Sequence, residues 1–223
     1  MPNNHNTQHA SVAASSSSSN FPHNAFDPGV RHDRDDTSAC PFCQIASVYT
    51  PYNPADPPSS DADLLNPEAG APSPATFVVL STPLLVGFLD IMPLSTGHVL
   101  LCTRRHRPKL TDASAAESLE LGRYLRVLSA AVARATGVHD WNVVQNNGAA
   151  AAQVVPHMHF HVIPRPELRS KGPERFTSTM FGRGMREDLD EEEAAPLAER
   201  IREVVAEVMH EEAEAEAEDK AKL

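Results

Sequence analysis

Residues 156–165, Pro-His-Met-His-Phe-His-Val-Ile-Pro-Arg, are the part of this sequence that most restricts what the chain can fold into. Histidine occupies every second position, with apolar residues between and a proline near each end. Successive side chains of a β-strand point to opposite faces of a sheet, so the alternation predicts a strand with its histidines on one face. Met158, Phe160 and Val162 then face or border a core. Neighbouring histidines are expected roughly 6–7 Å apart.

Three imidazoles in this spacing, His157, His159 and His161, are compatible with more than one kind of site. Zinc needs three or four converging ligands, so a straight row cannot close around one ion by itself. In a catalytic row, the middle imidazole attacks while its neighbours organise the substrate or supply protons. An imidazole with a pKa near ~6.5 is largely neutral at pH 7, and the phosphoramidate that it forms with phosphorus hydrolyses easily. The strict alternation argues against three ordinary half-buried histidines.

The rest of the sequence predicts an α+β fold with an antiparallel sheet of about five strands. Short apolar runs separated by Pro, Gly or small-residue turns predict the strands, at 78–80, 85–89, 98–103, 141–147 and 153–165. A long helix begins after a cap at Thr111 or Asp112 and ends at Gly137. An apolar stripe from Leu197 to Val208 predicts an extra C-terminal helix, packed on the domain or on a partner subunit.

Composition divides the chain into three parts. Residues 1–37 are too polar to repay the entropy of ordering and predict a disordered tail. Residues 38–186 form the domain, with a Pro-rich insertion at about 50–75 that we expect to hang in solvent rather than cover the site. Residues 187–223 are an acidic helix and tail. Their 15 acidic and four basic residues account for the whole net charge of −11, which leaves no electrostatic case for nucleic-acid binding.

The sequence also restricts the compartment. Residues 1–20 lack the apolar stretch of a secretory signal, and no window approaches the ~20 apolar residues that cross a bilayer. The three cysteines cannot all pair with one another, so a reducing compartment would keep them as thiols or metal ligands. We therefore expect a soluble intracellular protein, cytoplasmic or nuclear.

Residues 157–163 closely resemble the signature of the histidine triad (HIT) superfamily, His-φ-His-φ-His-φ-φ with φ apolar. "CPFC", "FLDIMPLSTGHVLL", "RRH" and "QNNGAAAAQVVPH" resemble further landmarks, so the likeness covers roughly residues 40–165. The resemblance implies the HIT fold, usually a homodimer, whose members hydrolyse or transfer nucleoside monophosphates through a covalent nucleotidyl-histidine. It implies that His159 is the nucleophile, that the His157 carbonyl fixes its tautomer, and that His161 and His98 complete the catalytic set.

The same resemblance implies a purine nucleotide site. Phe88 and Ile91 would sandwich the base, and Asp90 would accept both ribose hydroxyls. Asn146 and Gln153 would contact the phosphate or the bridging atoms. Turn and loop-capping roles are the alternatives for Asp90, Asn146 and Gln153.

One departure lies just before the triad. Where many relatives have Gly-Gln-Ser/Thr, this chain has Ala152, Gln153 and Val154, so a hydroxyl donor is missing. Since the nucleophile remains, we expect catalysis to persist with a different rate or leaving-group preference.

Cys40 and Cys43 have zinc-knuckle spacing but supply half a site. The resemblance implies that His106 and His157 complete it as a structural zinc site, which clamps the N-terminal segment to the sheet remote from the chemistry. Free thiols are one alternative. A redox pair is another, although no thioredoxin-like βαβ pattern surrounds the cysteines.

The third triad position separates the branches of the superfamily, because a glutamine there marks the transferases. His161 therefore favours hydrolysis, either by a Hint-type adenosine phosphoramidase that releases AMP or by a diadenosine polyphosphate hydrolase. The first needs no metal for attack, whereas magnesium often accompanies a polyphosphate. A non-catalytic nucleotide-binding scaffold is the alternative from another class.

Overall fold

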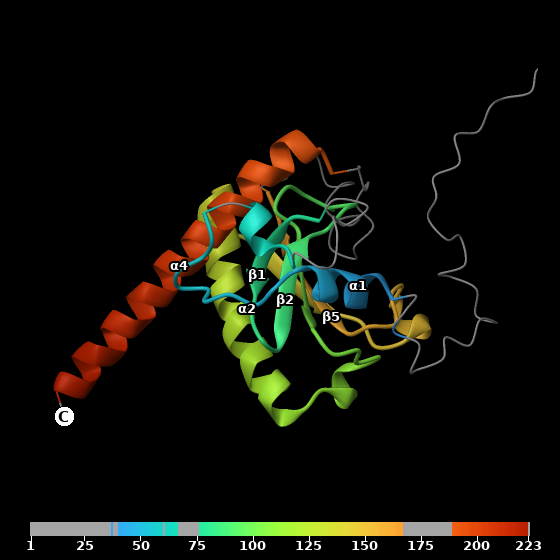
Figure 1. The fold of residues 1–223 in the computed structure, drawn as a ribbon, viewed down its shortest axis with the longest axis horizontal. Coiled ribbons are helices and arrows are strands. Elements are labelled where there is room, and N and C mark those ends of the chain that lie inside the picture. Colours follow the sequence, from blue (N-terminus) through green and yellow to red (C-terminus); the bar gives the residue numbers. More distant parts are fainter. Residues whose placement is uncertain (1–36, 38–39, 60, 67–75, 167–188, 223) are drawn as a thin grey trace, which may run out of the picture.

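The computed structural model describes residues 37, 40–59, 61–66, 76–166 and 189–222. Five antiparallel strands form one sheet, as the sequence predicts, and their order in the sheet is β1-β2-β3-β5-β4 (Figure 1). The strands are β1 Val78–Ser81, β2 Leu85–Leu89, β3 Val99–Thr103, β4 Trp141–Gln145 and β5 His159–Pro164. Apart from Thr37, the predicted N-terminal tail lies outside the described residues.

The histidine strand is shorter than the alternation predicts. Strand β5 begins at His159, so His157 lies in the turn before it. Pro156 has no backbone N–H to donate to a ladder, and the N–H of Met158 donates to the carbonyl of Arg107 at 2.6 Å instead of to a neighbouring strand. The triad is therefore one turn histidine followed by two strand histidines.

Among the described residues, three α-helices accompany the sheet: α1 Pro41–Val48, α2 Ala115–Thr136 and α4 Glu191–Ala221. The cap of α2 differs from the prediction, because Ser114 forms a reciprocal capping box with Glu117. Asp112 ends the short 3₁₀ helix η3 Leu110–Asp112. Gly137 adopts a left-handed conformation, φ 68°, and ends α2 as predicted.

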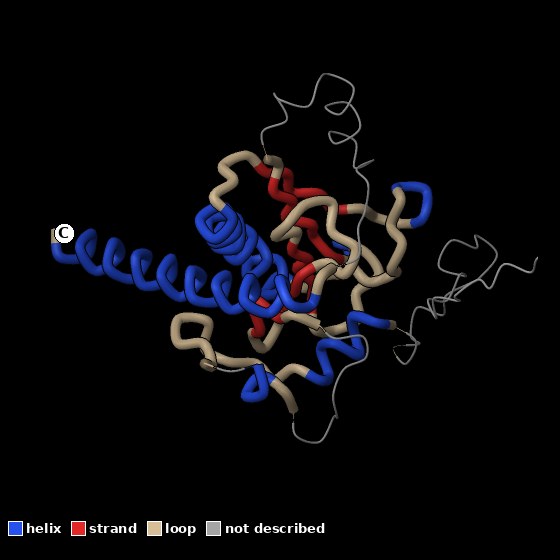
Figure 2. Tube along the Cα trace, turned by 90° about the horizontal axis from the view of Figure 1, so that it is seen from above, coloured by secondary structure: helices blue, strands red, loops and turns tan. Residues whose placement is uncertain are grey.

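The two faces of the sheet carry different layers (Figures 1 and 2). On one face, α2 and α4 pack against a large apolar core that includes Leu101 and Val162. On the other face, α1 and the first part of the insertion pack over Phe88 and Cys102. Cross-strand pairing aligns Cys102 with His159, so the strand histidines belong to this second face.

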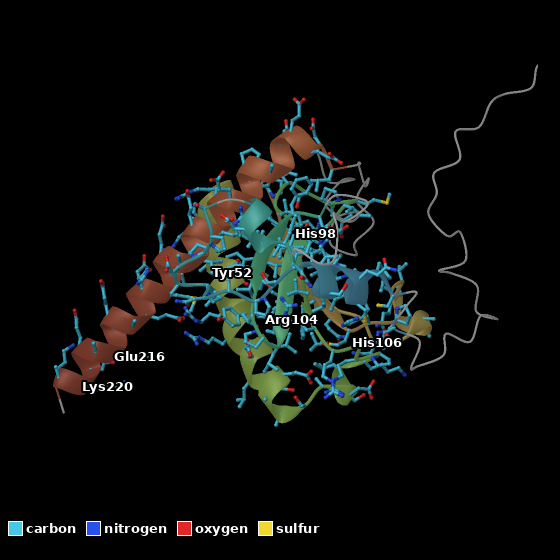
Figure 3. All side chains as sticks on the ribbon, viewed as in Figure 1. Tyr52, His98, Arg104, His106, Glu216 and Lys220 are labelled. Atoms are coloured by element: carbon cyan, nitrogen blue, oxygen red, sulfur yellow. The ribbon has the colours of Figure 1, made fainter. Side chains whose placement is uncertain are left out.

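The described part of the insertion does not hang in solvent, contrary to the prediction. Leu64, in the 3₁₀ helix η2 Asp61–Leu64, is 1% exposed. The N–H of Tyr52 donates to the carbonyl of Ser81 at 2.9 Å, along the outer edge of β1. The guanidinium of Arg104, labelled in Figure 3, donates to the carbonyls of Ala46 in α1, of Tyr49 just before the insertion and of Thr82 after β1. Residues 67–75 lie outside the described residues.

Helix α4 confirms the extra C-terminal helix. Ile201, Val204, Val205 and Val208 are buried, as the apolar stripe predicts. After Glu211 nearly every residue is exposed, and Figures 1 and 3 show this end, with Glu216 and Lys220, projecting away from the sheet. In the described parts of the chain, no helix is long and apolar enough to cross a membrane.

Candidate active site

His159 is held in one tautomer by the main chain. Its Nδ1 lies 2.7 Å from the backbone carbonyl oxygen of His157. A carbonyl can only accept, so the Nδ1 carries the proton and the lone pair is on Nε2. Burial lowers the pKa of His159, which keeps the ring neutral at pH 7. A neutral imidazole with a fixed free nitrogen is suited to nucleophilic attack.

His98 and His161 form a hydrogen-bonded pair beside this nucleophile. The N–H of Leu94 donates to His98 Nδ1 at 3.2 Å, so a neutral His98 carries its proton on Nε2. That nitrogen lies 3.0 Å from His161 Nδ1, which places the His161 proton on its own Nε2. The rings of His159 and His161 are 4.8 Å apart between centroids, closer than the expected spacing along the strand. The site thus offers a nucleophilic nitrogen next to a donating N–H.

Asp90 lies behind His98 and shapes the turn after β2. Its Oδ1 accepts from the N–H of Met92 at 2.9 Å, and its Oδ2 lies 3.4 Å from His98 Nδ1. Asp90 is buried, 6% exposed, among the apolar residues that flank it in the sequence. Asp90 therefore has the turn role given above as its alternative. It also contacts His98, a contact that the sequence pattern does not predict.

Phe42 is a site residue that the sequence reasoning missed. Its ring makes edge-on contacts with His159 and with Phe88, at centroid distances of 5.1 and 5.3 Å. Phe88 is buried, and Ile91 is half-buried in the following turn. The sequence signal for Phe42 is its position between Cys40 and Cys43, because a cysteine pair that binds a metal would bring it close to the third and fourth ligands.

The loop before the triad is braced by Gln153. Its Oε1 accepts from the N–H of Gly148 at 2.6 Å, and its Nε2 donates to the carbonyl of Pro108 at 2.8 Å. Gln153 therefore has the loop-capping role, while Asn146 is half-buried at the start of the same loop. Ala152 has φ 61°, the left-handed conformation that favours glycine, at the position where the family pattern has one. Val154 is 39% exposed and offers no hydroxyl.

The four residues of the predicted metal site come together. One donor atom each from Cys40, Cys43, His106 and His157 lies within 4.8 Å of the others. Cys40 Sγ and Cys43 Sγ are 3.4 and 3.6 Å from His157 Nδ1, and Cys43 Sγ is 3.4 Å from His106 Nδ1. A tetrahedral zinc with ordinary bond lengths holds sulfur and nitrogen ligands roughly 3.5 Å apart. The distances fit that ion.

The surroundings of the cluster also fit a cation. His157 Nε2 lies 2.7 Å from the carbonyl oxygen of Thr103, so its proton is there and its Nδ1 lone pair is directed to the sulfurs. Burial lowers the pKa of His157 to about 4, which keeps the ring in the neutral, ligating form. Burial, and then the neighbouring Cys40, raise the pKa of Cys43 to about 12. Two thiolates at this place need a positive charge to stabilise them.

This cluster is not remote from the proposed nucleophile His159, contrary to the prediction. His157 contributes its side chain to the cluster and its carbonyl to His159. Phe42 lies between the two cysteines in sequence and its ring contacts His159. The donor cluster and the nucleophile are therefore neighbours.

The fold and site define a class: an α+β domain whose sheet carries a buried histidine in a fixed tautomer and a hydrogen-bonded histidine pair, beside a Cys₂His₂ donor cluster. The profile of the HIT domain family matches residues 72–168. An adenosine 5′-monophosphoramidase of Candida albicans is 32% identical over 141 residues, which cover 61% of this chain and 87% of that protein. The chain belongs to the HIT family.

Other curated relatives match over shorter segments. An adenosine 5′-monophosphoramidase of Schizosaccharomyces pombe is 43% identical over 88 residues, which cover 38% of this chain and 61% of that protein. The matching part of the chain covers between 21% and 58% of the length of three further curated relatives. A zinc-bound HIT family protein from Mycobacterium smegmatis shares the fold, with a TM-score of 0.53, 24% identity, and coverage of 78% of this chain and 97% of that one.

Proposed function

We propose that the chain is a nucleotide hydrolase that cleaves AMP phosphoramidates or related adenylyl compounds through a covalent nucleotidyl-His159 intermediate. The observation that carries the proposal is the fixed tautomer of His159, whose free Nε2 stands beside the His161 ring. The names of the two similar yeast proteins support the substrate class. The purine would lie in the region of Phe88 and Ile91, with Asp90 toward the ribose and Asn146 and Gln153 near the phosphate.

In the first step, His159 Nε2 attacks phosphorus, the P–N bond breaks, and a protonated His161 gives its Nε2 proton to the departing amine. In the second step, water attacks phosphorus, the P–Nε2 bond breaks, AMP leaves, and the proton of the water returns to His161.

A protonated His161 donates through Nδ1 to His98 Nε2, 3.0 Å away. His98 must then carry its proton on Nδ1, so the bond from the Leu94 N–H is given up and the Nδ1–H donates to Asp90 Oδ2, 3.4 Å away. Asp90 and His98 thus stabilise the charged form.

The test is AMP release from an adenosine phosphoramidate and from diadenosine tri- and tetraphosphate, measured in parallel by chromatography. We expect the phosphoramidate to be turned over fastest, without added metal, because its leaving group is a neutral amine once protonated. A preference for the dinucleotides, with stimulation by magnesium, would replace this activity with that of a polyphosphate hydrolase. AMP binding without release from any substrate would leave a non-catalytic nucleotide-binding scaffold.

We also propose that Cys40, Cys43, His106 and His157 hold a structural zinc ion. Donor distances near those of a tetrahedral site and the acceptor behind His157 support it. When bound, the ion supplies a positive charge that stabilises both thiolates and joins α1 to the turn before β5. It takes no part in the phosphoryl steps.

The exposed edge of the sheet supports a homodimer. Strand β4 pairs with β5 on one side, and within the described residues no strand pairs with its other side. Trp141, Val143 and Val144 are 41%, 46% and 37% exposed, which is unusual for apolar residues on an edge strand. We propose that two copies of the chain associate through β4.

Replacing Val143 by Lys places a charge on this edge and is expected to convert the dimer to a monomer in size-exclusion chromatography with light scattering. Val143 pairs with Val162 rather than with a site histidine, so the site is spared. Leu119→Lys, at a 79% exposed position on α2, is the matched control and should remain a dimer. Dissociation by Leu119→Lys alone would show that the interface lies on α2 instead. A monomeric parent protein would show that there is no such dimer.

A further inference from the structure

Hydrogen bonds hold the turn after β2, residues 90–92, and one of them comes from a distant part of the chain. The N–H of Asp90 donates to the carbonyl of His98, and the N–H of Met92 donates to Asp90 Oδ1, both at 2.9 Å. These two bonds are local. The third joins the N–H of Leu189 to the carbonyl oxygen of Ile91 at 3.0 Å. Leu189 immediately precedes Asp190, the N-cap of α4.

The start of α4 is itself fixed to the sheet. Ala194 and Ala198, 1% and 0% exposed, belong to the same core cluster as Leu89, the last residue of β2. The small side chains let the helix approach the sheet closely. One turn further on, the guanidinium of Arg202, 3% exposed, donates to the carbonyl of Val78 in β1 at 2.7 Å. The close packing of Ala194 and Ala198 therefore presents the N–H of Leu189 to Ile91 from a rigid support, and Arg202 is a separate anchor further along the helix.

Helix α4 also lies beyond residues 72–168, the part that matches the HIT domain profile. Its far end projects away from His98 and His106 in Figure 3, so only its first turns are placed to act on the site. We propose that the beginning of α4 is a brace for the nucleotide site: the Leu189 bond positions Ile91 and thereby raises affinity for the nucleoside, without altering the chemistry at His159. Leu189 is therefore a positioning residue. The identity of the ligand in this proposal rests on the proposed function.

The physical reason is preorganisation. A turn that is already ordered loses less conformational entropy when a nucleoside binds against it. A backbone hydrogen bond contributes a net ~0.5–1.5 kcal/mol, so losing this one should weaken binding roughly twofold to tenfold. The rate of the chemical step depends on His159 and its donor, which the bond does not contact. The brace therefore predicts a change in affinity separated from a change in turnover.

Leu189→Pro removes the N–H donor and is the decisive variant. Leu189→Ile retains the donor, and Arg202→Met removes a different anchor of the same helix without touching the turn. We would measure the dissociation constant of AMP by calorimetry, kcat and KM, and amide hydrogen exchange at Met92, all well below the unfolding temperature. Leu189→Pro should weaken AMP binding and raise KM roughly twofold to tenfold with kcat unchanged, and speed exchange at Met92. Leu189→Ile and Arg202→Met should match the parent protein.

Equal AMP affinity and equal Met92 exchange in Leu189→Pro and the parent would overturn the brace. Equal weakening by Arg202→Met would also overturn it, since α4 would then act through general stability. If the parent protein does not bind AMP, the proposed function fails, yet exchange at Met92 still decides whether the Leu189 bond orders the turn. Faster exchange in Leu189→Pro but not in Arg202→Met would uphold it, and unchanged exchange would refute it.

Discussion

Replacing His159 by Asn is expected to lower AMP release on the order of 10⁴-fold while AMP binding changes little. The asparagine carboxamide can still donate to the carbonyl of His157, but it offers phosphorus no nucleophilic nitrogen. Removing a covalent nucleophile typically costs at least this factor in kcat, because the remaining binding groups stabilise the transition state only partly. Steady-state AMP release and calorimetric AMP binding measure the two effects separately.

The same substitution at His139 is the matched control, because that side chain is exposed in the connection between α2 and β4. His139→Asn should retain the parent rate. Acid quenching during turnover adds a direct test, since an adenylyl group should be trapped on the parent protein and on His139→Asn but not on His159→Asn. Full activity in His159→Asn would place the nucleophile elsewhere, and an adduct mapped to His161 would identify it.

The fold was largely predictable because its signals are local. Alternation marked His159 and His161, and Gly137 marked the end of α2, where only a left-handed residue fits. The start of α2 was mispredicted because two plausible caps, Thr111 and Asp112, precede the true one. Only the reciprocal bond from Ser114 to Glu117 distinguishes them, and it depends on the path of the preceding chain.

The site was predictable in its members but not in its connections. The contact of Phe42 with His159 joins segments that are far apart in the sequence, and no periodicity encodes it. The bond from Leu189 to Ile91 and the bond from Met158 to Arg107, beside His157, also join segments that are far apart in the sequence. Tertiary packing decides such contacts, and it brings the cysteines beside His159, where the resemblance implies a site remote from the chemistry.

The second large effect is expected from Cys43→Ala, which should abolish zinc binding and lower the midpoint of thermal unfolding by about 10 °C or more. A structural zinc contributes folding free energy directly, and each kcal/mol corresponds to about 2–4 °C for a domain of this size. The parent protein, purified without chelator, should contain one zinc per chain by elemental analysis. Cys102→Ala is the matched control because that cysteine is buried nearby but is not among the four donors, so its zinc content should equal that of the parent.

Cys43→Ala should also slow adenylylation of His159, although neither cysteine contacts the reacting atoms. The cluster restrains the turn that carries the His157 carbonyl, and it restrains the helix that carries the Phe42 ring, and both contact His159. Losing them lets the imidazole rotate and exchange tautomers, so a smaller fraction of molecules presents a free Nε2. Chelation of the parent protein should reproduce the loss, and restored zinc should reverse it. Unchanged adenylylation in a zinc-free, folded Cys43→Ala would show that the metal site stabilises the fold alone, and a zinc-free parent would show that the cysteines serve as thiols.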